Sequence, residues 1–329
     1  MRCCGIKLGD IRKLASNFTY TESETNQEQV RAYLRSMGYD PDAFYQELEM
    51  NSDLVDAHRD TSYSNAQLQL HSHSFYELLY CRNTCGAEYL VGTERYRLQR
   101  GDVIFVPPGV SHRPLLPADM REPYKRYVMW FSTEFMAYLA NLLQASPEQP
   151  PGSMLLRTAG TKWEYLGDYF RQNVLEAEKQ APGWEAVLTG NAICLLTQLH
   201  RAFQDRKAAV PTAEKPELLD QLLTYIEQHM AEKITLQQTA RQFFVSQSTV
   251  SQLFRQRIGV SFYHFVTQRR LITAKEQIIE GWLLEDVAVR VGFADYSAFY
   301  RAFKQEYGIS PRQFRNLSVD GGSKRTRTG

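Results

Sequence analysis

Three side chains in the first third of the chain have the types and spacing of a metal site or a polar-ligand site. His71 and His73 stand two residues apart, and Glu77 follows four residues later, inside the apolar and aromatic segment LQLHSHSFYELLY of residues 68–80. Residues two apart on a β-strand point to the same side of the sheet, so we expect both imidazoles to face inward. Imidazoles and a carboxylate suit Zn, Fe, Mn or Ni, and they also suit hydrogen bonds to a ligand.

The elements that must position these side chains are short strands. Turn residues break residues 66–131 into short segments rich in β-branched and aromatic residues, and a second cluster, GDVIFVPPGVSH, ends on His112. Closely spaced strands with turn signals predict an antiparallel sandwich or barrel. The expected strands are AQLQLHS, FYELLYC, AEYLVG, ERYRLQ, DVIFVP and RYVMWFS.

The composition is that of an ordinary globular protein. The chain has 329 residues, of which 43% are hydrophobic and 23% charged, which predicts a buried core and about two domains. Its five cysteines are Cys3, Cys4, Cys81, Cys85 and Cys194. Because the number is odd and no disulfide framework is visible, we expect a reducing compartment, with Cys81 and Cys85 as buried or strand cysteines. The N-terminus lacks a signal-peptide pattern and no long apolar run occurs, which together favour the cytoplasm and no membrane contact.

The charge is distributed unevenly along the chain. Residues 241–329 hold 14 Lys/Arg and 7 Asp/Glu, a net of +7, whereas residues 1–240 hold the remaining 24 and 30, a net of −6. A basic C-terminal part on a nearly neutral chain indicates a polyanionic partner for that part, although a solvated charged surface would look the same.

Helical patterns follow residue 131 and flank the expected strands. An apolar stripe runs along residues 185–203 through Leu188, Ala192, Leu195, Leu199 and Phe203, and we expect it to form a dimer contact, to pack on the chain's own barrel, or both. A shorter helix is expected around residues 27–37. Residues 205–216 are charged and carry two prolines, which is typical of a linker.

The C-terminal part contains one unit twice. TLQQTARQFFVSQSTVSQLFRQRIGVSFYHF resembles LLEDVAVRVGFADYSAFYRAFKQEYGISPRQF, with Ala240 matching Ala288 and Phe254 matching Phe303. The small alanine lets a second helix cross closely, and Ser246 in the first copy and Asp295 in the second are expected helix caps. Each second helix should end before a glycine with positive φ, Gly259 or Gly308. Two helices joined by a tight turn predict a helix-turn-helix.

Residues 217–315 resemble the DNA-binding domain of the AraC/XylS family of bacterial transcription regulators. The resemblance rests on RRLITAK, VAVRVGFAD, FYRAFK and GISPRQFR, and it covers the whole domain. The family implies two helix-turn-helix units that enter successive major grooves of double-stranded promoter DNA. Gly281 and Trp282 depart from the plainer loop that the family usually has there.

The second helix of each unit should present polar residues to DNA and apolar residues to the core. We expect Val250, Leu253, Phe254, Phe299 and Phe303 to face inward. The expected DNA-binding residues are Gln247, Ser248, Ser251, Gln252 and Arg255 in the first unit and Tyr296, Ser297, Tyr300, Arg301 and Lys304 in the second. By family position, the residues that should face bases are Ser248, Ser251 and Gln252 in the first unit and Tyr296, Ser297, Tyr300 and Arg301 in the second. Only Arg301 among them has the fork suited to guanine, so the site sequence cannot be derived.

The histidine segment and GDVIFVPPGVSH together resemble the two cupin motifs. In metal-binding cupins the counterparts of His71, His73, Glu77 and His112 ligate a metal, whereas sensor domains of this regulator family often use them to line an effector site without metal. Leu116 stands where the second motif commonly has Asn, and the gap to Gly86 is long. We therefore predict no metal and no cofactor, and an effector site at these four residues.

Several further side chains could serve the same site. Arg126 matches a frequent arginine of the family and could pair with Glu77 or hold the ligand. Tyr76, Tyr80, Tyr89, Tyr96 and Trp130 could stack on a sugar but are expected mainly in the core or rim. His58, His200, His229 and His264 are expected to stand outside the cluster.

The predicted fold has an N-terminal all-β cupin-like barrel with flanking helices and a C-terminal all-α double helix-turn-helix. The expected boundaries are 1–50 for a helical extension, 51–204 for the effector-binding and dimerisation domain, 205–216 for the linker, 217–316 for the DNA-binding domain and 317–329 for a disordered tail.

The predicted function is that of a homodimeric transcription regulator, and activation is the expected direction. Its effector would be a small molecule such as a sugar, and its partners would be promoter DNA and RNA polymerase. One alternative is a metal-dependent cupin enzyme with a helical appendage. Another is a DNA-binding protein whose barrel only dimerises.

Overall fold

The computed structural model describes residues 50, 52–63, 70–117, 119–144, 154–205 and 217–316. The helix expected around residues 27–37, nearly all of the expected linker and the tail 317–329 lie outside these residues. The described chain forms two compact units. One unit comprises Ser52–Glu227 and Thr239–Ser261, and the other comprises residues 228–238 and 262–316. No helix among the described residues combines the length and the apolar character needed to cross a bilayer.

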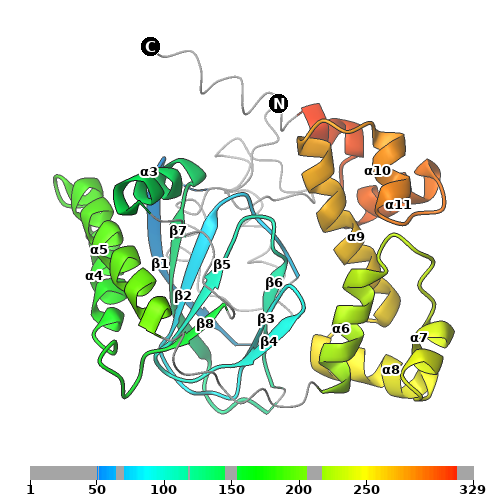
Figure 1. Ribbon diagram of the computed structural model, residues 1–329, viewed down its shortest axis with the longest axis horizontal. Helices are drawn as coiled ribbons and strands as arrows, with labels where there is room; N and C mark the ends of the chain where they lie inside the picture. The colour runs from blue at the N-terminus through cyan, green and yellow to red at the C-terminus, as the bar shows by residue number, and fades with distance from the viewer. Residues whose placement is uncertain are drawn as a thin grey trace, which may run out of the picture. The chain divides into compact units, whose positions relative to one another are not determined.

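Two antiparallel sheets form the N-terminal sandwich (Figure 1). The five-stranded sheet has the order β1 (Val55–Ser62), β7 (Tyr124–Phe131), β2 (Tyr76–Cys81), β5 (Asp102–Val106) and β8 (Leu155–Arg157). The three-stranded sheet has the order β4 (Glu94–Arg97), β3 (Glu88–Val91) and β6 (His112–Leu115). This β-rich domain followed by helices confirms the predicted fold class.

Three strands escape the sequence pattern for local reasons. Strand β1 reads VDAHRDTS, so its polar residues hide the apolar alternation, and β6 reads HRPL, where the proline argues against a strand. Strand β8 has only three residues. Of the expected strand AQLQLHS, only its last residues are described, and His71 forms an isolated antiparallel bridge with His112.

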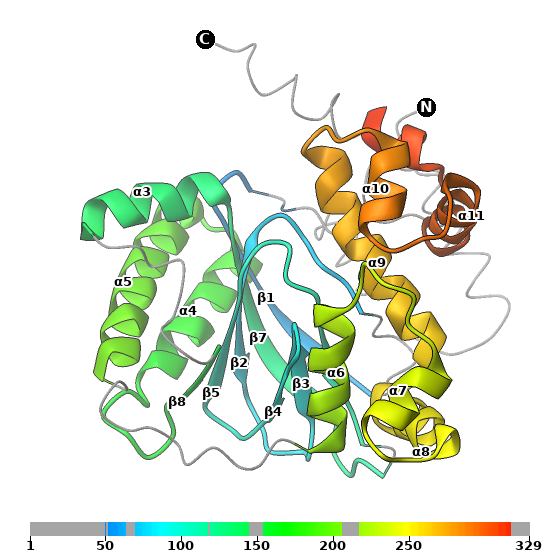
Figure 2. The same cartoon turned by 45° about the vertical axis from the view of Figure 1, so that its right-hand side comes forward.

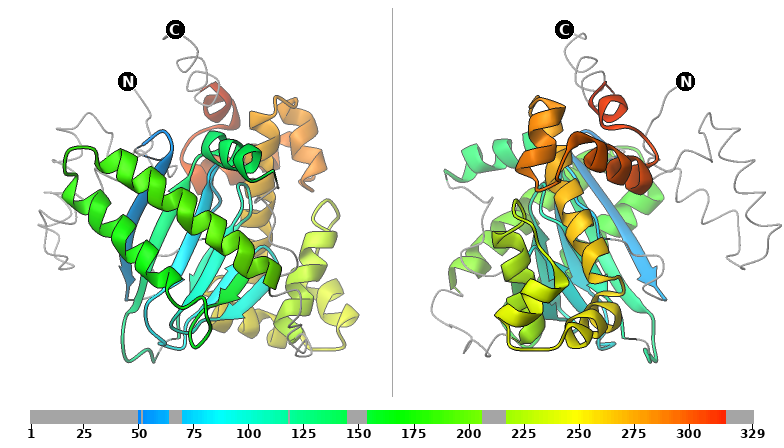
Figure 3. Two further views of the ribbon diagram at one scale, coloured as in Figure 1. Left: turned by 60° about the vertical axis from the view of Figure 1, so that its left-hand side comes forward. Right: turned by 90° about the vertical axis from the view of Figure 1, so that its right-hand side faces the viewer.

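Helices cover the outer face of the five-stranded sheet. Figure 3 shows α4 (Leu166–Lys179) and α5 (Trp184–Asp205) lying side by side across it, and α3 (Thr133–Leu143) follows β7 directly. The apolar stripe of α5 is buried in the core between these helices and the sheet, with Leu188 1% and Leu195 0% exposed. The stripe therefore packs on the chain's own sandwich, which was one of the two expected roles. The other role, a dimer contact, stays a prediction.

The first copy of the repeated unit follows α6 (Leu218–Gln228), which lies beside β3 and β4 (Figures 1 and 2). It consists of α7 (Leu236–Gln242), α8 (Gln247–Leu253) and a π-helical continuation, η3 (Phe254–Ile258). Ser246 caps α8 by accepting a hydrogen bond of 3.0 Å from the Thr249 backbone N–H. The backbone turns at Gly259 with φ 83°, as the repeat predicts.

The second copy follows the long helix α9 (Phe262–Ile279) and consists of α10 (Leu284–Arg290) and α11 (Tyr296–Tyr307). Asp295 caps α11 by accepting a 2.7 Å hydrogen bond from the Ala298 N–H, and Gly308 ends the helix with φ 72°. The inward residues Phe299 and Phe303 are fully buried, as are Val250 and Phe254 in the first copy, whereas Leu253 is only half-buried.

The turns of the two copies both contain a residue with positive φ, but the residue type differs. Gly292 adopts φ 94°, and a Cβ atom placed on it would lie 2.1 Å from the Met230 carbonyl oxygen. At the matching position of the first copy, Phe244 adopts φ 55° with its side chain 96% exposed. The first copy thus carries a strained aromatic residue where the second needs glycine.

Candidate functional site

Four of the predicted residues come together inside the sandwich; we call His71, His73, Glu77 and His112 the imidazole cluster. His73 lies in the segment before β2, Glu77 lies on β2, and His112 begins β6. The Nε2 atoms of His73 and His112 lie 3.7 and 3.1 Å from Oε2 of Glu77. His73, Glu77 and His112 are at most 6% exposed, so two sheets bring the motif together away from solvent.

The two buried imidazoles are oriented by the backbone. Nδ1 of His73 lies 2.8 Å from the Phe75 carbonyl, and Nδ1 of His112 lies 2.8 Å from the Val110 carbonyl. A carbonyl oxygen only accepts, so each Nδ1 must carry the proton that it donates. Nε2 is then the nitrogen that faces the Glu77 carboxylate: it holds a lone pair in a neutral imidazole and donates a hydrogen bond to the carboxylate in a protonated one.

Glu77 is held from its other side by Trp130 on β7, whose Nε1 donates a 2.8 Å hydrogen bond to Oε1. Burial by itself would raise the pKa of Glu77, but the facing imidazoles of His112 and His73 outweigh it and hold that pKa well below the usual range. Burial lowers the pKa of His73, which favours its neutral form. The cluster therefore has a buried carboxylate beside at least one neutral imidazole.

Three polar atoms at the centre of the cluster lack a hydrogen-bond partner. They are Nε2 of His73, Nε2 of His112 and Oε2 of Glu77. These atoms lie within 4.8 Å of one another, and their side chains are the group of ligand-type residues that could hold a metal ion. Two imidazoles with backbone-anchored Nδ1 atoms and one oriented carboxylate fit a divalent transition metal ion. The same atoms also fit a ligand that donates hydrogen bonds.

The other predicted effector residues differ in their surroundings. The rings of His71 and His112 are 4.3 Å apart, so His71 belongs to the cluster, and it is its half-buried member. The alternative in which Arg126 pairs with Glu77 is wrong. Its guanidinium instead donates to Asp60 at 2.8 Å and to Ser62 at 2.9 Å, because β1 and β7 are neighbours.

Strand β1 supplies three polar residues beside the cluster that the sequence pattern does not group with it. His58 was expected outside the cluster, but it is 3% exposed and its ring meets Trp130 edge-on at 5.0 Å. Asp60 and Ser62 follow at steps of two, and both engage Arg126. The alternation of polar residues at 58, 60 and 62 was the signal that could have found this face.

Aromatic residues around the cluster divide into neighbours and core. Tyr89 on β3 stacks on His112 with ring centroids 6.3 Å apart. Burial raises the pKa of Tyr89 and of Tyr124 well above the usual range, and the charge of Glu77 adds to both shifts. Tyr76 instead packs in the core near Phe105, and Tyr80 lies near Phe170.

Cys81 behaves as the sequence predicts, whereas Cys85 is neither buried nor on a strand. Cys81 is buried on β2, and Cys85 is half-buried and also free. Burial raises the pKa of the Cys81 thiol to about 12, and its Sγ donates to the Asn83 carbonyl. A protonated, buried thiol is neither a metal ligand nor a nucleophile at neutral pH.

The predicted DNA-reading residues lie on two helices with solvent-facing polar sides. In the first copy Gln247, Ser248, Gln252 and Arg255 are exposed and Ser251 is half-buried. In the second copy Ser297, Arg301 and Lys304 are exposed, while Tyr296 and Tyr300 are half-buried with ring centroids 6.2 Å apart. Both helices have a capped N-terminus and a buried apolar side, formed by Val250 on α8 and by Phe299 and Phe303 on α11, as a recognition helix requires.

A cupin-like sandwich followed by two helix-turn-helix units defines a class of proteins, the one-chain regulators that join a sensor to a DNA-binding domain. The comparison with known protein families supports this class. Residues 54–260 match the AraC-like ligand binding domain, and residues 239–317 match a helix-turn-helix domain. The chain belongs to the AraC family of transcription regulators and is a DNA-binding protein with a ligand-binding domain.

Individual relatives match this chain at modest identity. The HTH-type transcriptional activator RhaS of Salmonella arizonae is 26% identical over 249 residues, covering 74% of this chain and 86% of the relative. RhaS of Salmonella typhimurium is 25% identical over the same coverage. Among solved structures, the C-terminal domain of AraT from Geobacillus stearothermophilus is 30% identical and covers 31% of this chain and 85% of its own, with a TM-score of 0.30. Fatty-acid-bound ToxT from Vibrio cholerae is 12% identical and covers 80% of this chain and 95% of its own, with a TM-score of 0.34.

Proposed function

We propose that this regulator activates transcription in response to a small polar molecule, of which a carbohydrate is the leading candidate, bound at the imidazole cluster. The observation that carries the proposal is the group of buried polar atoms without partners at one place in the sandwich. Such atoms cost free energy unless a ligand or water satisfies them.

The chemistry of these atoms favours a hydroxyl-rich effector. Nε2 of a neutral His73 and Oε2 of the Glu77 carboxylate accept hydrogen bonds, whereas Nε2 of His112 accepts when its ring is neutral and donates when its ring is protonated. The neighbouring Tyr124 hydroxyl and His58 Nδ1 also lack partners. Sugar hydroxyls both donate and accept, so one molecule could satisfy several of these groups together. Tyr89 and Trp130 offer aromatic surface beside them.

A second candidate for the cluster is a divalent metal ion held by His73, Glu77 and His112, which is favoured by the convergence of their three ligand atoms. When bound, such an ion would supply a Lewis acid. In this proposal the ion would take part in effector sensing and not in catalysis, because two capped, solvent-facing helix-turn-helix units indicate a DNA-binding protein. We therefore propose that the chain is not an enzyme.

A thermal-shift experiment separates the two candidates. Full-length protein treated with a chelator is heated alone, with a panel of mono- and disaccharides, or with Zn²⁺, Mn²⁺ or Ni²⁺. We expect at least one sugar to raise the Tm of the wild type and of His200→Gln, a control on α5 outside the cluster, but not of Glu77→Gln. A rise with metal alone would assign the cluster to the ion. No rise with either, or an equal sugar shift in Glu77→Gln, would contradict effector binding at this cluster.

We also propose that α8, the start of η3 and α11 contact DNA through the ten predicted residues and that Arg301 contributes the most specific base contact. Its exposed guanidinium stands on the polar face of α11 and can form two parallel hydrogen bonds to guanine. Arg301→Ala should weaken binding to a selected promoter duplex by about 1–3 kcal/mol and relax preference at one base pair. The exposed Arg201 on α5 provides the control, since Arg201→Ala removes the same charge away from both reading helices. Equal binding by both variants in a mobility-shift assay would refute the assignment.

Two partners complete the proposal. A homodimer would present paired reading helices to DNA, and RNA polymerase would be recruited at the promoter, as expected of an activator. Sedimentation of the full chain with and without DNA tests the first of these.

A further inference from the structure

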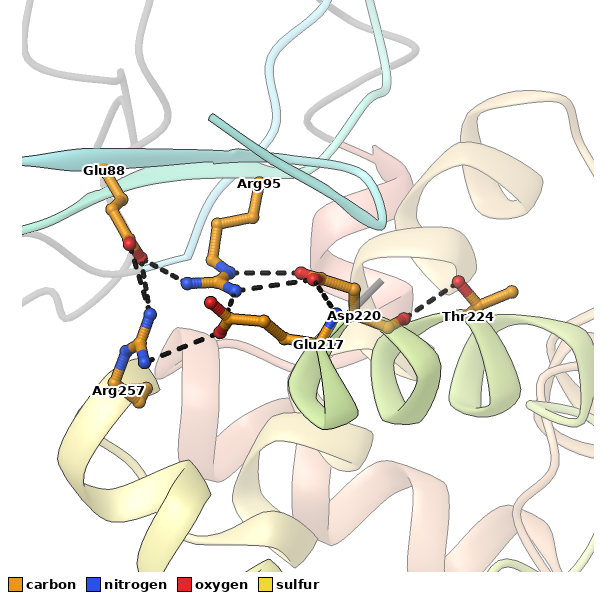
Figure 4. A network of polar contacts seen from close by, with 6 residues as sticks. All are labelled: Glu88, Arg95, Glu217, Asp220, Thr224 and Arg257. Carbon is orange, nitrogen blue, oxygen red and sulfur yellow. Dashed lines mark hydrogen bonds and ion pairs between the residues drawn. The ribbon is translucent and has the colours of Figure 1, made fainter. Parts of the chain in front are cut away.

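Five charged side chains form a connected network on the outer side of the three-stranded sheet (Figure 4). We call them the ion network. Their elements are far apart in sequence: Glu88 lies on β3, Arg95 on β4, Glu217 directly before α6, Asp220 on α6 and Arg257 on η3. All five belong to the compact unit of Ser52–Glu227 and Thr239–Ser261. The network therefore joins the sandwich to the end of the first DNA-reading helix.

Arg95 is the centre of the network. Its guanidinium donates to Glu88 at 2.7 Å, to Glu217 at 2.6 Å and to Asp220 at 3.1 Å. Its side chain is only 6% exposed, so its bond to the buried side of Glu88 is shielded from water, whereas Glu217 is itself exposed. The bonds of Arg95 fix α6 on the β3–β4 hairpin.

Arg257 forms the outer part of the ion network, which is more accessible to solvent. Its NH2 group lies 3.1 Å from both carboxylate oxygens of Glu88, and NH1 lies 3.7 Å from Glu217. Its side chain is 37% exposed, so screening by solvent makes its bonds easier to exchange than those of Arg95. With three carboxylates and two arginines, the network has a net charge of 2 − 3 = −1. The charge of Arg257 is thus occupied by Glu88 and is not available to a phosphate.

Strand β3 connects the network to the imidazole cluster. Glu88 and Tyr89 are adjacent on β3, so their side chains point to opposite faces of the sheet. The ring of Tyr89 stacks on His112, and β3 also pairs with β6, which begins at His112. A ligand that moved His112 or Tyr89 would therefore act on the strand that carries Glu88.

We propose that the bond between Glu88 and Arg257 is a latch that holds the first helix-turn-helix on the sandwich and lowers its affinity for DNA until effector or DNA competes with it. The proposal rests on the regulator function above. DNA phosphates and the Glu88 carboxylate compete for the guanidinium of Arg257, so Arg257 cannot bind both at once. An effector would act by binding better to the arrangement in which β3 has released η3.

The test uses the full chain and changes only the sandwich side of the latch. Glu88→Gln removes the carboxylate that Arg257 binds and leaves every residue of α8 and η3 unaltered. Glu94→Gln is the matched control, because Glu94 is an exposed carboxylate on the same hairpin that accepts a hydrogen bond from Tyr96 in its own strand. Both variants change the net charge by the same amount. The probe is a duplex that the wild type itself selects from a random pool.

Without effector, Glu88→Gln should bind this duplex about fivefold or more tightly than Glu94→Gln, within the range of ordinary allosteric couplings. Backbone amides of Phe254–Ile258 should also exchange faster with deuterium in Glu88→Gln, while those of β5 remain protected. If Glu88→Gln is unstable, Arg257→Gln must give the same loss of protection in η3. Equal affinity and equal exchange in Glu88→Gln and Glu94→Gln would overturn the latch. Failure of the wild type to select any duplex would instead overturn the proposed function.

Discussion

The indole of Trp130 donates a 2.8 Å hydrogen bond from Nε1 to Oε1 of Glu77, and this bond turns Oε2 of the carboxylate toward the imidazoles of His73 and His112. Trp130→Phe keeps an aromatic ring but removes the donor. Since the buried carboxylate would lose a partner, we expect a loss of about 1–3 kcal/mol in the free energy of unfolding by urea. The ligand-induced rise in Tm should shrink as well. Trp163→Phe, at a half-buried tryptophan on the periphery of the core, should change neither. An unchanged ligand response in Trp130→Phe would mean that carboxylate orientation does not matter.

Arg126 is buried and depends on Asp60 for its charge partner. The pKa of Asp60 would be raised by burial but is held well below its usual range by the Arg126 guanidinium. Asp60→Ala should therefore cost about 2 kcal/mol in urea unfolding, because it leaves a buried cation unpaired. The double variant Asp60→Ala, Arg126→Met should be more stable than Asp60→Ala alone. Strictly additive losses in this cycle would show that the two side chains do not interact.

The pKa of Asp60 also sets a pH dependence. Because it is lower in the folded chain than in the unfolded chain, the bridge to Arg126 stabilises the fold above the unfolded-state pKa, and this stability is lost as the pH falls below that value. Asp60→Ala should lack this loss at acid pH.

Gly292 and Phe244 occupy matching turns with positive φ, and their substitutions should have opposite effects. Gly292→Ala places a Cβ atom against the Met230 carbonyl oxygen, so we expect the second helix-turn-helix to be destabilised by more than about 2 kcal/mol. Phe244→Gly relieves a left-handed aromatic residue that is almost fully exposed, so stability should rise by about 1 kcal/mol. Urea unfolding measures both, and a stability loss in Phe244→Gly would show that its ring has a structural role.

Asp102 on β5 is buried, and burial raises its pKa to about 6 against the bond that it accepts from the Gln99 N–H. Because the folded chain holds this proton more tightly than the unfolded chain, stability should fall as the pH rises from about 4 through about 6. Asp102→Asn keeps an acceptor for Gln99 and cannot ionise. It should be more stable than the wild type at pH 7.5, by on the order of 2 kcal/mol, and nearly equal at pH 4.5. A constant difference between the two pH values would exclude this titration.

Much of the fold follows from the sequence because the repeated unit carries several independent signals of a helix-turn-helix. Ala240, Ser246 and Gly259 carry the crossing, the cap and the turn in the first copy, and each behaves as its type predicts. The motif histidines could also be grouped correctly. His71, His73 and His112 stand in two segments that resemble the cupin motifs, and that resemblance groups them.

The parts that could not be predicted depend on contacts between distant strands. The bonds of Arg126 to Asp60 and Ser62 could not be predicted, because both partners lie on a strand whose polar residues hide its pattern. The bond between Glu88 and Arg257 joins residues 169 positions apart, and no local sequence pattern predicts it. Register and tertiary pairing, rather than propensity, decided these sites.

The central claim is that the duplicated helix pair of this chain reads DNA under the control of the sandwich. Selection from a random duplex pool by the full-length protein tests it most directly. Two helices entering successive major grooves should enrich two short elements spaced about one helical turn, roughly 10–10.5 base pairs, apart. The stringency of this enrichment should change in Glu77→Gln. Recovered duplexes indistinguishable from the input pool would contradict the account.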